Sequence, residues 1–231
     1  MRKKYYMILD TETAGTIQYP IAYNIGWMVC DKKGNELETR SFLIKELWID
    51  RRHLVEECFY KNKLPEYKRQ LKKGEISILP LKDIMSLMDK DVEKYHCKIG
   101  AYNMAFDKRA ITNVLNICNL PNKHFRNEKN LFCIMNLAEQ VLMKRSTYFR
   151  FCEQYNLFTE KGNLKTSAES CYKYITYNPY FIEAHMALED VRIEKDIFIH
   201  VLRQKKKLNW TKFGSVWQKV KKAYKKYKRK D

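Results

Sequence analysis

The sequence lacks several features that define other classes of protein. No apolar run approaches the roughly 18 residues that a membrane span needs, and the run behind the basic N-terminus reaches only Leu9 before Asp10 interrupts it, which is too short for a signal-peptide core. The seven cysteines form no Cys-x-x-Cys pair, and their odd number and scattered positions indicate free thiols rather than disulfides or a structural zinc site. We therefore expect a cytoplasmic protein that is not attached to a membrane.

The composition is that of a folded chain. Hydrophobic residues make up 45% and aromatic residues 13% of the 231 positions, which excludes an intrinsically disordered protein. No internal repeat is visible, and no low-complexity segment lies outside the C-terminal region. A chain of this length forms one domain of above-average size, or a domain with an appendage.

The positive charge is concentrated at the C-terminus. The net charge is +18, and residues 203–231 hold 13 Lys and Arg against one Asp, whereas residues 1–202 hold 32 basic and 26 acidic residues. We interpret residues 205–231 as a basic appendage on a mildly basic domain of residues 1–204. A polyanion is the expected partner.

The hydrophobic pattern predicts an α/β domain. Strands are expected over residues 5–9, 21–30, 37–44 and 98–102, and the first three form an antiparallel meander with a hairpin turn at 31–35. Helices are expected over residues 106–117, 131–143, 147–155, 166–174 and 186–202, the fourth starting at the capping box Thr166-Ser-Ala-Glu169. Residues 50–93 show helical spacing broken by Pro65, Gly74 and Pro80, so we interpret them as a helical insert.

Asp10 and Glu12 form the first candidate site. They follow the apolar run 5–9 at a spacing of two, so on a strand their side chains point to the same side. Two adjacent carboxylates repel each other unless a proton or a cation compensates, and a divalent metal with oxygen ligands does so best. The alternative is a strand-end turn. The same spacing recurs at Glu36/Glu38, Asp89/Asp91, Asp91/Glu93 and Glu194/Asp196. Those pairs lie in polar, lysine-rich segments, where an exposed surface is the ordinary explanation.

The second candidate is the segment Asn103-Met-Ala-Phe106-Asp107, where a short buried strand gives way to a helix. Functional loops of open α/β sheets lie at the carboxyl ends of strands, so a ligand carboxylate is expected there. The alternative is that Asp107 only stabilises the first turn of the helix through the helix dipole.

The third candidate is the segment from His185 to Asp190. Positions five apart on a regular helix differ by about 140°, so His185 should precede the helix if both side chains face one point. Asp190 flanks the apolar face of the expected helix and Glu189 lies nearly opposite it, so Asp190 is the acid that reaches an interior cleft. Glu194 also falls on the apolar face, and we expect it to be salt-bridged or to support the site rather than to bind a ligand.

Together the three segments resemble the motifs of the DnaQ-like 3′→5′ exonucleases, in their histidine-bearing DEDDh class. The motifs are Leu9-Asp10-Thr-Glu12-Thr-Ala-Gly15, Asn103-x-x-Phe106-Asp107 and His185-x-Ala-x-x-Asp190, in that order. The span 5–202 is similar in size to the family's domain. The resemblance implies a ribonuclease H-like α/β fold, a mixed five-stranded sheet flanked by helices, here with a basic C-terminal helical extension.

The resemblance also implies a site and an activity. Two divalent ions, Mg²⁺ or Mn²⁺, would be held by Asp10, Glu12, Asp107 and Asp190, with Asp10 bridging both ions and Glu12 holding the one that activates water, and His185 would be the general base. Substrate contacts are implied at Thr11, Thr13, Ala14, Asn103 and Phe106. The implied reaction releases nucleoside 5′-monophosphates from the 3′ ends of DNA or RNA, single-stranded ends above all.

Two positions depart from the family pattern, and a second class of function stays open. Tyr102 stands where many relatives carry His, and Val191 where Ala is usual. Both changes bear on packing or substrate fit. The alternative to an exonuclease is a non-catalytic nucleic-acid-binding module, or a proofreading partner of a polymerase in replication. The intact set of five catalytic residues argues against a non-catalytic domain, because nothing would otherwise keep four repelling carboxylates together.

The C-terminal appendage is expected to form an amphipathic basic helix. Ser215-Val-Trp-Gln218 resembles a capping box, and Phe213, Trp217, Val220, Tyr224 and Tyr227 recur at helical spacing. Three functions compete: an arm that grips phosphates, a membrane-surface helix, and a helix that only packs its aromatic stripe on the domain. We favour the arm. Its expected nucleic-acid contacts are Lys219, Lys222, Lys226 and Arg229.

Overall fold

The computed structural model describes residues 4–211 and 214–229, which form an α/β structure. The strands are β1 (Tyr5–Gly15), β2 (Pro20–Asp31), β3 (Glu36–Ile44), β4 (Ser77–Leu79), β5 (Lys98–Ala101) and β6 (Leu131–Cys133). The α-helices are α1 (Lys45–Trp48), α2 (Arg52–Glu56), α3 (Leu64–Lys73), α4 (Leu81–Tyr95), α5 (Met104–Ile117), α6 (Ile134–Val141), α7 (Ser146–Gln154), α8 (Ala168–Thr176), α9 (Ala187–Arg203) and α10 (Val216–Tyr227). Two short 3-10 helices are η1 (Lys61–Lys63) and η2 (Glu128–Asn130).

The strands form one mixed sheet in the order β4-β3-β2-β1-β5-β6. As the pattern predicted, β1, β2 and β3 are an antiparallel meander. The other strands pair in parallel: β4 with β3, β5 with β1, and β6 with β5. The expected count of five strands is wrong, because β4, inside the insert, adds a sixth at the β3 edge. Residues 131–133 form β6 instead of starting a helix. A short, fully buried apolar run does not distinguish the two structures by its periodicity.

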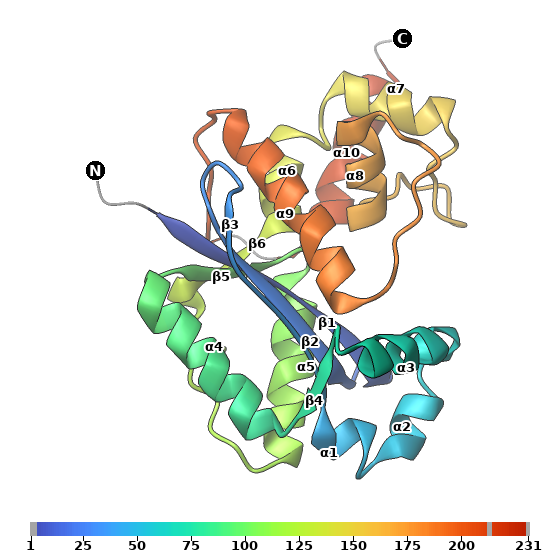
Figure 1. Ribbon diagram of the computed structural model, residues 1–231. Coiled ribbons are helices and arrows are strands. Elements are labelled where there is room, and N and C mark those ends of the chain that lie inside the picture. Colours follow the sequence, from blue (N-terminus) through green and yellow to red (C-terminus); the bar gives the residue numbers. More distant parts are fainter. Residues whose placement is uncertain (1–3, 212–213, 230–231) are drawn as a thin grey trace.

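Both faces of the sheet are covered, as Figure 1 shows: α4 and α5 lie on one face, and α6 and α9 on the other. The alternation of side chains along β1 divides them between two cores. Met7 and Leu9 join the core that includes α4 and α5, whereas Tyr6 and Ile8 join the core that includes α6 and α9. Because β2 is enclosed in the same way, all its residues except Asp31 are buried.

The insert is largely helical, as predicted, and its three break residues have specific positions. Pro65 lies in the first turn of α3, where its missing N–H costs no hydrogen bond. Gly74 ends α3 with φ 70°, a left-handed conformation that favours glycine. Pro80 immediately precedes α4.

Helix starts were predicted less well than helix positions. Ser167, not Thr166, caps α8, and its hydroxyl accepts a hydrogen bond from the Ser170 N–H at 3.2 Å. Ser215 precedes α10 with φ 59° and makes no capping hydrogen bond with its side chain, so the capping-box prediction is wrong there. Both segments are polar enough to offer more than one local hydrogen-bonded start.

The basic C-terminal helix packs against the domain. Val216 and Val220 are buried among α6 and α7 residues of the second core, whereas Trp217 is 53% exposed. The apolar stripe is therefore rotated by one residue from the predicted one at this end of the helix. Phe213, the first residue of the predicted stripe, lies outside the described residues.

The structure bears on the expected free thiols and on the expected lack of a membrane-spanning helix. All seven cysteines are free, as expected. Within residues 4–211 and 214–229, no helix combines the length and the apolar character needed to cross a bilayer.

Asp91 is buried, contrary to the exposed position that its polar surroundings suggested. Its carboxylate accepts hydrogen bonds from Trp27 Nε1 at 2.9 Å and Arg40 Nε at 2.8 Å, which ties α4 to β2 and β3. Asp91→Ala should lower the free energy of unfolding by about 1–3 kcal/mol, because the buried indole N–H loses its acceptor. Urea unfolding followed by circular dichroism measures this loss.

The matched control is Glu38→Ala. Glu38 is the other carboxylate near the Arg40 guanidinium, at 3.3 Å, and it is partly exposed. Its loss should cost about 0–1 kcal/mol, as is usual for surface ion pairs. Equal costs for the two variants would contradict a special role for the buried Asp91.

Candidate functional site

β1 carries Asp10 and Glu12 within its length rather than at its end. The strand continues to Gly15, and the two acids lie opposite Gly26 and Asn24 of β2. On the other edge of β1, the pairing with β5 covers residues 6–8 and stops before Asp10. The two carboxylates therefore lie just beyond the end of the parallel pairing between β1 and β5, where helices can approach β1.

The start of α9 lies unusually close to β2. A side-chain Cβ at Gly26 would lie 3.0 Å from the backbone carbon of Ala187 and 3.1 Å from its Cβ. Asn24 strengthens the contact, because its Oδ1 accepts hydrogen bonds from the Ala187 N–H at 3.4 Å and the Tyr67 hydroxyl at 2.9 Å. This contact brings Asp190, on the first turn of α9, beside β1. Sequence reasoning missed Gly26 and Asn24, although an isolated glycine within a strand pattern is a signal of close backbone approach.

Asp10, Glu12 and Asp190 meet at one point. Each offers a carboxylate oxygen, and these oxygens all lie within 4.8 Å of one another. Asp190 Oδ1 is buried, and no described residue donates a hydrogen bond to it. Buried oxygens rarely stay without a partner, and a cation with oxygen ligands would supply one. These three acids, all predicted from the sequence, could hold a metal ion.

Asp107 lies beside this group but is not one of the three. It is buried in the first turn of α5, and its Oδ1 accepts a hydrogen bond from the Thr11 hydroxyl at 2.9 Å. Thr11 points to the opposite side of β1 from its neighbours Asp10 and Glu12, and so reaches α5. The hydroxyl of Thr11, predicted to contact substrate, is thus engaged by Asp107. Metal binding by Asp107 stays a prediction.

The carboxyl groups are in an environment that disfavours their charge. Burial raises the pKa of Asp107 to about 7. Burial, followed by repulsion from Glu183, raises the pKa of Glu12 to about 8 and that of Asp190 to about 9. Burial, then the nearby Glu194 carboxylate, raises the pKa of Asp10 well above its usual range. The charged cluster therefore needs a cation, or protons, to be stable.

His185 precedes α9 by two residues, as the helix geometry predicted. Its backbone is left-handed, with φ 54°, and its imidazole stacks on the ring of Tyr60 with the centroids 4.1 Å apart and the planes at 16°. Burial, then the positive charge of Lys63, lowers the pKa of His185, which favours the neutral imidazole. Tyr60 and Lys63 belong to the insert, so the insert reaches the site. No motif in the sequence indicated this contact.

Two further acids surround the cluster. Glu194 is buried, and its Oε2 accepts a hydrogen bond from the Tyr102 backbone N–H at 3.0 Å, so it contacts the strand end that leads into α5. Glu183, which sequence reasoning missed, is partly buried, and burial raises its pKa to about 7. The Tyr102 hydroxyl donates to the Thr166 carbonyl at 2.9 Å, in line with a packing role.

The other predicted substrate contacts lie near the same end of the sheet. Thr13 is partly buried, and the methyl group of Ala14 packs in the core. Asn103 is exposed at the start of α5, and the partly buried Phe106 ring has the Arg109 guanidinium 5.7 Å from its centroid. Their contacts with substrate stay predictions.

The predicted contacts of the basic helix divide into two groups. Lys219 Nζ lies 3.9 Å from Glu139, on the side of α10 that faces the domain. Lys222, Lys226 and Arg229 line a hollow on the surface of the helix and, among the described residues, lie within ion-pair distance of no acid.

The raised pKa values predict how pH and metal act on stability. Glu12, Asp107 and Asp190 keep their protons to higher pH in the folded chain than in the unfolded chain, where carboxyl groups titrate near pH 4. Their contribution to stability is therefore complete below about pH 4 and is lost as the pH rises through about 7 to 9. The metal-free protein should melt at lower temperature at about pH 9 than at about pH 6, and Mn²⁺ should raise the melting temperature more at the higher pH.

Thermal unfolding in EDTA and in MnCl₂ at both pH values tests this prediction. Asp190→Asn should remove most of the Mn²⁺ effect, whereas Asp83→Asn, an exposed acid on α4, should leave it unchanged. A Mn²⁺ effect that is the same in Asp190→Asn and the parent chain would exclude this cluster as the metal site.

No protein-family model matches the chain, and no curated protein matches its sequence. The three carboxylates and the neighbouring imidazole are therefore the groups from which a function can be inferred.

Proposed function

We propose that the chain is a metal-dependent 3′→5′ exonuclease that releases nucleoside 5′-monophosphates from the ends of DNA or RNA, with the DEDDh site of the DnaQ-like family. The observation that carries the proposal is the meeting of Asp10, Glu12 and Asp190 within 4.8 Å, from segments about 180 residues apart in the chain. The mixed sheet flanked by helices is compatible with a ribonuclease H-like fold.

The donor set fits Mg²⁺ or Mn²⁺. These ions bind oxygen ligands, and Asp190 Oδ1 is a buried oxygen to which no described residue donates a hydrogen bond, so it is free to bind an ion. With Asp107 as a fourth ligand, the four carboxylates would offset the charge of two divalent ions and leave positions for phosphate and water. When bound, such ions supply an activated water and stabilise the leaving oxygen.

In the proposed reaction the protein's own residues position the groups and move the proton. The neutral imidazole of His185 accepts a proton from the attacking water, whose oxygen bonds to phosphorus as the bond from phosphorus to the 3′ oxygen breaks. The released 3′ oxygen takes up a proton from water, and the imidazolium returns its proton to the solvent. Tyr60 orients the imidazole by stacking on it, and Thr11 orients the Asp107 carboxylate.

The adjacent acids Glu189 and Asp190 offer a matched test of this function. Single-stranded DNA and RNA of one sequence, labelled at the 5′ end, should be shortened to a ladder in the presence of Mg²⁺ or Mn²⁺. Asp190→Asn should lower the rate on the order of 10³-fold, because a ligand and its charge are lost. Glu189→Gln, one residue away in the same turn of α9, should stay close to the parent rate.

Three outcomes contradict the proposal. One is tight binding of both probes without shortening, which would favour a non-catalytic nucleic-acid-binding module or a proofreading partner. Another is shortening that EDTA does not stop. The third is a ladder of shortened products that still carry a label placed at the 3′ end, which would mean that the strand is degraded from its 5′ end.

The imidazole provides a second test. His185→Ala should lower turnover by about 10²- to 10⁴-fold, since the general base is lost, while the Mn²⁺-induced rise in melting temperature persists. Tyr60→Ala should lower turnover by about tenfold, because the imidazole loses the ring that orients it. Tyr60→Phe keeps the stacked ring and should restore the parent rate.

Two results would overturn the assigned role of His185. Loss of the Mn²⁺ effect in His185→Ala would make the imidazole a metal ligand, which excludes the DEDDh assignment. Faster turnover in Tyr60→Ala would mean that the stack holds the imidazole away from the reaction.

A further inference from the structure

The basic helix α10 is attached to the domain by one face. Val216 and Val220 are buried, and the ring of Tyr224 lies 5.4 Å from that of Phe149. The Tyr224 hydroxyl donates to Glu153 at 2.7 Å. These contacts leave a second side of the helix, the outer face, formed by Gln218, Lys221, Lys222, Lys225, Lys226 and Arg229.

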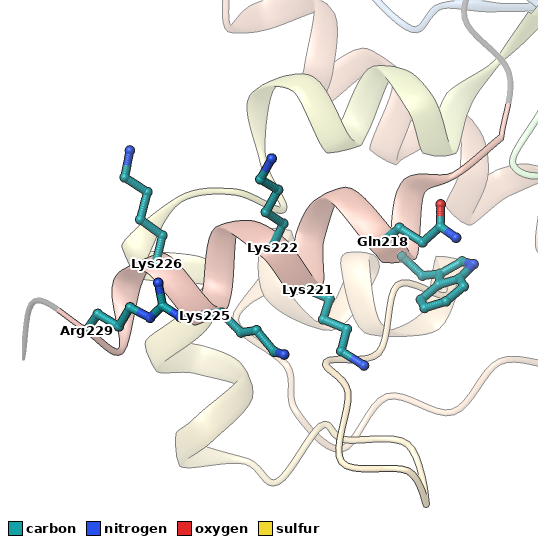
Figure 2. Close-up of a pocket in the computed structure, with 7 residues that line it drawn as sticks. Gln218, Lys221, Lys222, Lys225, Lys226 and Arg229 are labelled. Carbon is teal, nitrogen blue, oxygen red and sulfur yellow. The ribbon is translucent and has the colours of Figure 1, made fainter.

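The outer face concentrates positive charge that the domain does not neutralise. Among the described residues, none of its four lysines nor Arg229 lies within ion-pair distance of an acid, and α10 itself contains no acidic residue. The cations toward the domain differ, because Lys219 lies near Glu139 and Lys228 pairs with Glu153 at 2.7 Å. In Figure 2, Lys221 and Lys225 extend from one side of the helix and Lys222 and Lys226 from the other. Packing of α10 on the domain explains the positions of Lys219 and Lys228, but it gives no reason for the four lysines of the outer face.

Trp217 lies where this face meets a second hollow. It lines the hollow of the outer face, of about 490 Å³, and also a neighbouring hollow of about 690 Å³ formed with residues 158–166. Lys161 and Lys165 line that second hollow together with the acid Glu160. Trp217 is 53% exposed, whereas Trp27 and Trp48 are buried and Trp210 stacks on Tyr6.

We propose that the outer face of α10, with Trp217 as a stacking platform, binds single-stranded nucleic acid without sequence preference. The cations would contact successive phosphates, and a base would stack on the exposed indole. Stacking needs an unpaired base, so single strands are favoured over duplexes. The link of this surface to substrate delivery rests on the proposed nuclease function, whereas the binding itself does not.

An acidic lipid surface fits these observations less well. A helix that lies in a membrane interface buries a continuous apolar face in the lipid. The apolar face of α10 is already occupied by the domain, and Trp217 is the one large apolar side chain that the described part of the helix leaves exposed. The remaining groups suit phosphates in water.

Binding is measured by fluorescence anisotropy of a labelled thymidine oligonucleotide, using the full chain with Asp190→Asn so that the probe is not shortened under the proposed function. Trp217→Ala should weaken binding by about 5- to 150-fold, and Trp217→Phe should restore most of the loss. The double variant Lys222→Gln, Lys226→Gln should weaken binding. It should also make the plot of log association constant against log salt concentration less steep by about 1.4, which is about 0.7 for each lost phosphate contact.

The charge-matched control is Lys82→Gln with Lys90→Gln. Both lysines are exposed on α4, which Figure 1 shows at the opposite end of the molecule from α10, and the two described side chains make no ion pair. This control should bind like the parent. The parent should bind a single strand more tightly than a duplex of the same length, and phosphatidylserine vesicles should not compete at equal phosphate concentration.

Four results would overturn the proposal. Equal weakening of binding by the α4 control and by the α10 variant would mean that only net charge matters, and an unchanged affinity in Trp217→Ala would exclude stacking on the indole. Equal affinity for duplex and single strand, or competition by the vesicles, would likewise contradict it. Because the test depends on no metal or turnover, it remains decisive if the exonuclease proposal fails. Conversely, loss of this surface need not abolish shortening of very short oligonucleotides at low salt.

Discussion

The close contact between α9 and β2 at Gly26 is the constraint on which the site depends. Only a small residue at this point of β2 lets the first turn of α9, at Ala187, lie against the sheet. Asn24 completes the contact by accepting the Ala187 N–H, a donor that the helix itself leaves unpaired. Because Gly26 is the strand partner of Asp10, the same contact brings Asp190 to Asp10 and Glu12. The position of a helix relative to a strand thus creates the acidic cluster.

The cluster itself opposes folding. Several carboxyl groups are buried near one another, and both burial and mutual repulsion raise their pKa values. The surrounding structure holds them in place through contacts that do not involve their charge: the two cores on either side of β1, the Thr11 hydroxyl on Asp107, and the Tyr102 N–H on Glu194. Natural proteins tolerate such local destabilisation chiefly at functional sites. A bound cation would convert the repulsion into attraction.

Charge is divided between two parts of the molecule. The acids gather between β1 and α9, just beyond the parallel pairing of β1 with β5, and a group of cations with no ion-pair partner among the described residues lies on the outer face of α10. The insert contributes to the acidic part, because Tyr60 stacks on His185 and Lys63 faces both His185 and Glu12. Under the proposed function, these acids would repel the phosphates of a nucleic acid, and a separate basic surface would hold the strand by groups that attract it.

The sequence by itself determined much of the local structure and identified the three acids that the structure brings together. Three apolar runs and the hairpin turn at 31–35 identified the meander, and the five-residue spacing from His185 to Asp190 placed the imidazole before α9, because both arguments need only neighbouring residues of the chain. Local patterns could not reveal β6, the buried position of Asp91, the stacking of Tyr60 on His185, or the face of α10 that stays exposed. Each of these depends on which distant segment lies alongside, and a short apolar or charged segment has the same pattern whether it is covered or exposed. Tertiary structure decided them, as it decided that Asp10, Glu12 and Asp190 meet at one point.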